Sequence, residues 1–99
     1  MYFITVIRLG NQNKVEDFKT VGYVSDRNEA ERCTKENADN IFEGGKYQYA
    51  IVSELETGMY PEIRDKEWYN YHVEDEYWIT INRCDAPEGL EDYKPYIMG

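Results

Sequence analysis

Residues 65–81, DKEWYNYHVEDEYWITI, hold six aromatic rings (counting the imidazole of His72) and five carboxylates in a stretch of seventeen residues. Aromatic and β-branched side chains alternate with polar ones on both sides of an acidic centre, a pattern typical of two antiparallel strands joined by a turn. The stretch therefore predicts strands over 67–73 and 77–81 with a turn at 74–76. Cross-strand aromatic pairs stabilise a sheet by about 0.2–1 kcal/mol each, so the rings have a structural use before any binding is considered.

The rest of the chain supplies the elements around this hairpin. Asp26 and Glu29 have the spacing of a helix capping box, which predicts a helix from about residue 27 to 42. Gly44 and Gly45 follow it, where a helix commonly ends in glycine. Apolar runs bounded by turn residues predict three further strands, over residues 2–9, 18–24 and 47–55.

The predicted fold class is α+β: an antiparallel four- to five-stranded sheet with one helix packed on one face, in the order ββαβββ. Residues 1–99 are expected to form a single domain, because a chain of this length supports one hydrophobic core. Residues 84–99, which contain Pro87, Gly89 and Pro95, are predicted to form an irregular C-terminal tail packed back on the domain. The predicted core consists of strand residues closed by two helix residues: Ile4, Val6, Tyr49, Ile51, Ile79 and Ile81, with Cys33 and Ile41 from the helix.

Charge is distributed unevenly along the chain, whose net charge is −9. Residues 1–50 contain eight acids and seven bases, a net of −1, whereas residues 51–99 contain twelve acids and four bases, a net of −8. Such an acidic half repels the phosphates of nucleic acid and of anionic lipid, so direct binding to either is not expected. It would attract a basic surface, although acidity also serves simply to keep a small protein in solution.

No enzyme motif is present in the sequence, and we expect no catalytic residue, cofactor or metal. His72 is the single histidine and lies in the middle of a predicted strand. Neither Cys33 nor Cys84 belongs to a catalytic motif. The adjacent carboxylates at 74–76 would point to alternate faces, and they lack the glycine and spacing of a calcium-binding EF-hand loop.

The expected location is the cytoplasm. The N-terminal run MYFITVIRL lacks the basic segment and cleavage site of a secretory signal. No apolar stretch approaches the ~20 residues needed to span a bilayer, so no membrane association is expected. The two cysteines are far apart and are predicted to be reduced thiols.

These features favour a small acidic, non-enzymatic protein-interaction module that binds a basic surface on a protein partner, with nucleic-acid charge mimicry as one form of that function. Two alternatives stay open: a small-molecule or metal-binding domain that uses the aromatic hairpin, and a housekeeping domain. The sequence leaves open which tryptophan faces outward. The candidate partner-binding residues all lie in the predicted hairpin: Glu74, Asp75, Glu76, Trp68, Trp78, Tyr69 and Tyr71.

The middle of the chain resembles a family of short uncharacterised proteins, of about 100 residues, from Firmicutes and other gut bacteria and from their mobile elements. The resemblance rests on three runs: NADNIFE at 37–43, YQYAIVSELETGMYP at 47–61 and EWY at 67–69. This chain departs from the pattern at Asn40, where the family has Asp, at Phe42, where it has Trp, and by an extra residue near Gly44. The resemblance implies a bacterial, mobile-element origin and an α+β fold, and it implies no activity.

Overall fold

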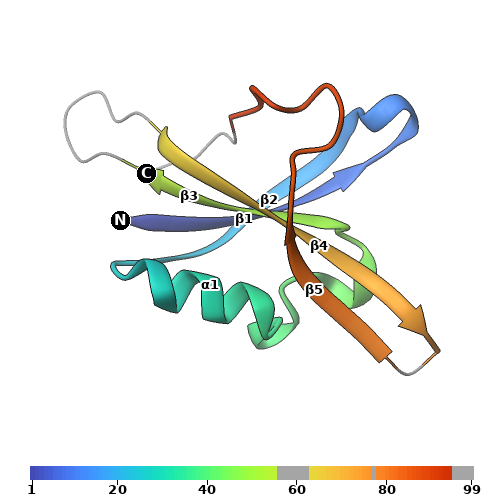
Figure 1. The fold of residues 1–99 in the computed structure, drawn as a ribbon, viewed down its shortest axis with the longest axis horizontal. Helices are drawn as coiled ribbons and strands as arrows, with labels where there is room; N and C mark the ends of the chain where they lie inside the picture. Colours follow the sequence, from blue (N-terminus) through green and yellow to red (C-terminus); the bar gives the residue numbers. More distant parts are fainter. Residues whose placement is uncertain (56–62, 77, 95–99) are drawn as a thin grey trace.

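The computed structural model describes residues 1–55, 63–76 and 78–94. They form one antiparallel five-stranded sheet with the spatial order β2-β1-β3-β4-β5 and one α-helix, α1, which lies between β2 and β3 along the chain (Figure 1). The predicted α+β class is therefore confirmed, with five strands and one helix packed against the sheet, and the position of α1 between β2 and β3 is consistent with the predicted order ββαβββ. The elements are β1 (Tyr2–Leu9), β2 (Val15–Val24), α1 (Arg27–Lys35), β3 (Tyr49–Leu55), β4 (Ile63–Asp75) and β5 (Trp78–Cys84), with three 3-10 turns, η1 (Asn11–Asn13), η2 (Ala38–Asn40) and η3 (Glu43–Gly45).

Helix α1 begins where the sequence predicts and ends seven residues earlier, at Lys35 rather than 42. Its N-cap is Asp26, whose carboxylate accepts a hydrogen bond from the backbone N–H of Asn28 at 3.0 Å. The predicted role of Glu29 in a capping box is replaced by an ion pair with Arg32 on the next turn of the helix. The helix ends early because Asn37 adopts a left-handed conformation (φ 50°), a role that the sequence assigns to the later glycines.

The strands also differ in extent from the prediction. The segment after the first turn becomes extended at Val15, three residues before the predicted start, and β3 starts at Tyr49 rather than 47. Strand β4 is much longer than predicted, because it pairs with two strands in turn. Its first part, from Ile63 to Asn70, pairs with β3, and its second part, from Trp68 to Asp75, pairs with β5. Tyr77, predicted to begin the last strand, lies outside the described residues.

One face of the sheet packs against α1 and the turns that follow it. Cys33 and Ile41 are half-buried and pack against this core, as predicted. Thr34 is fully buried, and its hydroxyl donates a hydrogen bond to the carbonyl of Ala30 at 2.8 Å, so this polar group is satisfied within the helix. The buried members of this helix-side core are Ile4, Val6, Ala30, Phe42, Tyr47, Ala50, Val52 and Tyr69.

The opposite face of the sheet has its own smaller core of Ile7, Ile51 and Trp68. Leu90 and Tyr93, from the segment after β5, pack against it. No helix or strand forms in residues 85–94, and the predicted apolar end of the tail, residues 96–98, lies outside the part of the chain that the structure describes.

The predicted core is correct in part. Ile4, Val6 and Ile51 are buried, but Ile51 lies on the opposite face from the other two, because it pairs with Thr5 between their positions. Tyr49 and Ile81 are only half-buried. Ile79 is 40% exposed, so its assignment to the core is wrong. Where the structure is described, no helix is both long and apolar enough to cross a membrane.

Candidate functional site

The outer end of the β4–β5 hairpin extends away from α1 and from the body of the domain (lower right in Figure 1). The two strands pair regularly from Trp68 opposite Cys84 to Val73 opposite Ile79, and Asp75 then lies opposite Trp78 after a register shift. The hairpin tip, defined here as residues 73–76 and 78–79, therefore lies at the outer end of a regular antiparallel ladder. The ladder directs the side chains of the tip away from the body of the domain, where a partner can reach them.

Three large apolar side chains are exposed within this tip. Trp78 is 64% exposed, Val73 57% and Ile79 40%. Val73 and Ile79 lie opposite each other on the face that carries α1, one pair further out than Tyr71, whose ring contacts that of Phe42 at 5.3 Å between centroids. The cover provided by the helix and its following turns thus ends at Tyr71, and the apolar surface continues beyond it.

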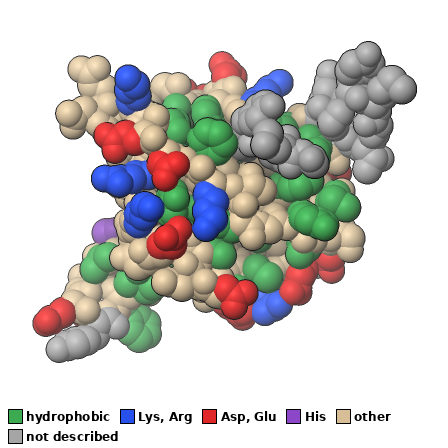
Figure 2. Space-filling model, turned by 180° about the vertical axis from the view of Figure 1, so that it is seen from behind, with side chains coloured by type: hydrophobic (Ala, Val, Ile, Leu, Met, Phe, Trp, Pro, Cys, Tyr) green, Lys and Arg blue, Asp and Glu red, His purple; other side chains and the backbone are tan. Residues whose placement is uncertain are grey.

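Carboxylates surround these apolar groups. Glu74, Asp75 and Glu76 are all exposed, and the sequence from residue 70 to 82 contains no lysine or arginine. On the face opposite α1, the Thr80 hydroxyl donates a hydrogen bond to Glu74 Oε1 at 3.5 Å, and His72 Nε2 lies 4.0 Å from the same oxygen. Figure 2 shows the projecting end of the hairpin (lower left), where hydrophobic and acidic side chains lie together. Trp78 precedes Ile79 in β5 and therefore points to the opposite face, so the tip presents exposed apolar side chains on both faces, next to carboxylates. Exposed apolar groups beside a single sign of charge are typical of a protein-binding site.

The structure separates the predicted partner-binding residues into two groups. Glu74, Asp75, Glu76 and Trp78 come together at the exposed tip, so Trp78 is the tryptophan that faces outward. Trp68 (5% exposed) and Tyr69 (1% exposed) belong to the interior, and Tyr71 is half-buried beside Phe42.

Packing explains why Trp68 and Tyr69 are unavailable to a partner. Trp68 contacts Tyr49 edge-on, at 6.0 Å between ring centroids, on the face opposite α1. Tyr69 lies in the helix-side core. Both rings contribute to stability. The prediction that they contact a partner is wrong, because both are buried.

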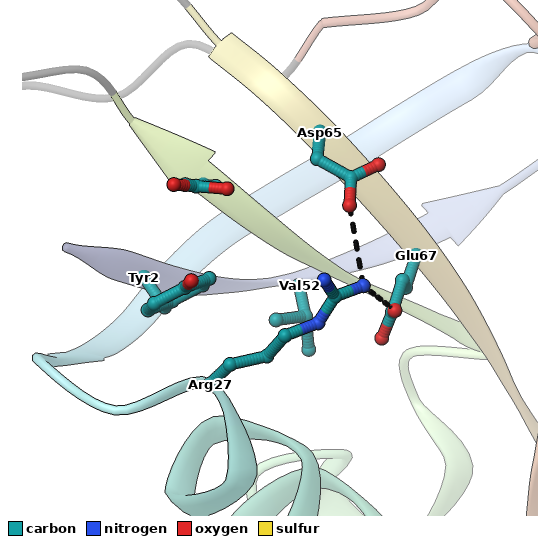
Figure 3. Close-up of a pocket in the computed structure, with 6 residues that line it drawn as sticks. Tyr2, Arg27, Val52, Asp65 and Glu67 are labelled. Carbon is teal, nitrogen blue, oxygen red and sulfur yellow. Dashed lines mark hydrogen bonds and ion pairs between the residues drawn. The ribbon is translucent and has the colours of Figure 1, made fainter.

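An ion-pair cluster around the buried Glu67, between α1 and β4, is a feature that the sequence does not predict. Glu67 is only 4% exposed. Arg27, at the start of α1, donates to the carboxylate of Glu67 and to Asp65 Oδ2, the latter at 3.2 Å (Figure 3). The Tyr69 hydroxyl donates to Glu67 Oε2 at 3.1 Å, and Arg83 Nη2 lies 3.5 Å from Glu67 Oε1.

These contacts determine the ionisation of the cluster. Burial opposes the charged form of Glu67, but hydrogen bonds with Arg27, Glu31 and Tyr69 outweigh it, so the pKa of Glu67 is lowered. The pKa of Tyr69 is raised by burial and by the negative charge of Glu67. The hollow beside Arg27 and Glu67 has no room for a water-sized molecule. The cluster therefore ties α1 to the sheet, and it has no space for a ligand.

The cysteines offer no reactive thiolate. Both are half-buried and neither forms a disulfide. Burial raises the pKa of the Cys33 thiol, and the nearby carboxylate of Glu29 adds to this effect. Burial likewise raises the pKa of Cys84. A raised pKa lowers the thiolate fraction and hence the nucleophilicity at neutral pH.

An open hollow of about 280 Å³ lies between β2 and the turns η2 and η3. Lys19, Asp39 and Glu43 are among the residues that line it, and they give it mixed charge. It contains neither His72 nor any residue of the β4–β5 hairpin, so it does not support a ligand site built from the aromatic hairpin. Within the described residues, no group of three or more His, Cys, Asp or Glu side chains is arranged to hold a metal ion.

The chain matches no protein-family model, no curated protein and no solved structure. The family resemblance therefore stays an expectation from the sequence.

Proposed function

We propose that this protein is a non-enzymatic protein-interaction module that docks the tip of its β4–β5 hairpin on a basic surface of another protein. The observation that carries the proposal is the position of Trp78, which is 64% exposed at the end of a projecting hairpin and is adjacent to exposed carboxylates. Tryptophan is among the residues that most often dominate binding energy at protein interfaces. An exposed indole at a projecting tip is therefore suited to serve as an apolar anchor.

The acidic side chains supply the other half of recognition. Glu74, Asp75 and Glu76 belong to a half of the chain with a net charge of −8, so the field around the tip attracts a basic partner. Complementary charge of this kind chiefly raises the association rate and selects the partner, whereas the buried anchor slows dissociation. The two roles fall on different residues of the same tip and can be separated by mutation.

The proposal also covers the kind of partner and the cellular setting. A partner whose basic surface also binds nucleic acid would make the hairpin tip a charge mimic, and nucleic acid would then compete for that partner. The proposed setting is the cytoplasm of a bacterium that carries the gene on a mobile element. This setting is supported by the absence of disulfides among the described cysteines and by the family resemblance, and by no feature of the hairpin.

The test compares proteins captured from a lysate of the source cell by four immobilised forms of the chain. These are the wild type, Trp78→Ala, a tip variant with Glu74, Asp75 and Glu76 changed to Lys, and a tail variant with Asp85, Glu88 and Glu91 changed to Lys. All six acids are exposed, so the two triple variants change the net charge equally at different places.

We expect the wild type and the tail variant to capture the same proteins. These proteins should be lost from both Trp78→Ala and the tip variant. Capture that is equal for all four forms, or is lost equally from both triple variants, would show that the tip is not the binding site.

A further inference from the structure

The five-stranded sheet has two edge strands, β2 and β5, and they differ in how well they are protected from further pairing. Strand β2 has two register shifts against β1 and carries Lys19, and both features discourage the addition of another strand. Strand β5 pairs with β4 without interruption from Ile79 to Cys84. Its sequence, WITINRC, is rich in β-branched residues and has no proline, and Arg83 near its inner end is its one charged residue.

The direction of the backbone groups on β5 follows from the ladder next to it. The amide of Tyr71 on β4 donates to the carbonyl of Gln48, on the β3 side, at 2.9 Å. Backbone groups alternate in direction along a strand, so residues of β4 at even positions face β5. Their partners Thr80, Asn82 and Cys84 then bond back to β4. Consequently the amides and carbonyls of Ile79, Ile81 and Arg83 point outward, where no strand of the described chain pairs with them.

This open edge is continuous with the proposed docking site, since β5 begins at Trp78. We propose that the partner adds an extended segment to the outer edge of β5 as a sixth strand, antiparallel to it, with basic side chains at the segment's C-terminal end. An antiparallel segment would place that end beside Glu74, Asp75 and Glu76. This inference rests on the proposed function and specifies the form of its partner, a mode of recognition in which backbone hydrogen bonds provide affinity and side chains provide register.

Charge favours such a basic segment over a second copy of this chain. In an antiparallel pair of two β5 strands centred on Ile81, Trp78 of each copy lies opposite Cys84 of the other. The acidic turn of each copy would then approach Asp85 of the other, and like charges directly opposite each other are destabilising. Each copy also carries a net charge of −9, which opposes self-association.

The probe is a seven-residue peptide, equal in length to β5, in which threonine and valine alternate and the last two residues are lysine. Binding is measured by isothermal titration, and amide hydrogen exchange is followed by NMR on the full chain. We expect the amides of Ile79, Ile81 and Arg83 to gain protection on binding, whereas those of Thr80, Asn82 and Cys84 are protected already. A peptide with its lysines moved to the N-terminal end should bind more weakly.

Two N-methylated forms of the peptide, one methylated at odd positions and one at even positions, give the decisive comparison. In a single register, held by the lysines beside the acidic turn, only one set of amides faces β5, so one form should lose about tenfold or more in affinity and the other should bind like the parent. Equal binding of the two forms, no binding of the parent peptide, or an unchanged exchange pattern would overturn the strand-addition proposal. A further outcome would also overturn the proposal. If the same amides are protected in the peptide-free protein at high concentration, and sedimentation shows a dimer, the partner of β5 is a second copy of this chain.

The charge-reversed tip variant separates this inference from the proposed function. Peptide binding that depends on Glu74, Asp75 and Glu76 but not on the methylation pattern supports docking at the tip and overturns strand addition. Binding that depends on the methylation pattern but is unchanged by charge reversal retains strand addition and contradicts charge-driven docking.

Discussion

Trp78 lies directly opposite Asp75 in the outermost pair of the β4–β5 hairpin, so an exposed indole and an exposed carboxylate share one end of the molecule. At the inner end of the same strand pair, Trp68 lies opposite Cys84 and is buried. The hairpin thus has an inner half that belongs to the core and an outer half that is presented to solvent. This division gives one tryptophan a structural role and makes the other available for binding.

The two tryptophans should respond differently to truncation. Trp68→Ala should lower the free energy of unfolding by about 3–5 kcal/mol, because it leaves a cavity between Ile51 and the C-terminal segment. Trp78→Ala should change it by no more than about 0.5 kcal/mol, as is usual for exposed positions. Urea unfolding followed by circular dichroism measures both. Comparable losses for the two variants would mean that Trp78 is also packed.

A second comparison concerns the stability effects of truncating Ile51, which is buried, and Ile79, which is exposed. Ile51→Ala should destabilise the fold by about 2–5 kcal/mol, since Ile51 is fully buried. Ile79→Ala should have a much smaller effect, because Ile79 is 40% exposed beside Val73. The measurement is thermal or urea unfolding of the purified variants. A large loss for Ile79→Ala would place the outer half of the hairpin in the core, contrary to the structure.

Alternation along the sequence is sufficient to predict the β4–β5 hairpin and the face to which each residue belongs. It does not show how far the cover of each face extends. Ile79 has the same apolar character as Ile81, yet it lies one pair beyond the last contact made by Phe42 and is exposed. Alternation does not show which tryptophan faces outward for the same reason, because burial of Trp68 depends on residues 86–93, whose packing has no periodic pattern.

The end of α1 and the Glu67 cluster were missed for different physical reasons. Asn37 adopts the left-handed conformation that ends the helix, and glycine is the residue that usually signals such an end. Glu67 is ionic and lies in a strand, where a charged residue is normally placed in solvent. Its burial depends on Arg27, forty positions away in sequence. The one available signal was its position between Asp65 and Tyr69, on the side of β4 that faces the helix.

The Glu67 cluster predicts a specific pH dependence of stability. The pKa of Glu67 in the folded protein is lowered from its ordinary value of 4.5, so the charged carboxylate stabilises the fold above pH 4.5. This contribution is lost as the pH falls through the folded-state pKa. Glu67→Gln should therefore be less stable than the wild type at pH 7, by about 1–3 kcal/mol, and the difference should narrow below pH 4.5.

Urea unfolding at a series of pH values tests this expectation, with Glu88→Gln as the control because Glu88 is exposed. The control should follow the wild type throughout the series. A constant difference between wild type and Glu67→Gln across the acid range would show that ionisation of Glu67 does not contribute.

The measurement that tests the docking proposal most directly is the association kinetics of a purified captured partner as a function of salt. For the wild type, the association rate should fall steeply as the Debye length shortens from ~10 Å at 0.1 M to ~3 Å at 1 M salt. A variant with Glu74→Gln, Asp75→Asn and Glu76→Gln should associate more slowly at low salt and show a flatter dependence. Trp78→Ala should instead accelerate dissociation while the salt dependence of association is retained. An association rate that depends on salt identically in the wild type and the neutralised variant, with dissociation unchanged in Trp78→Ala, would contradict the proposed role of the hairpin tip.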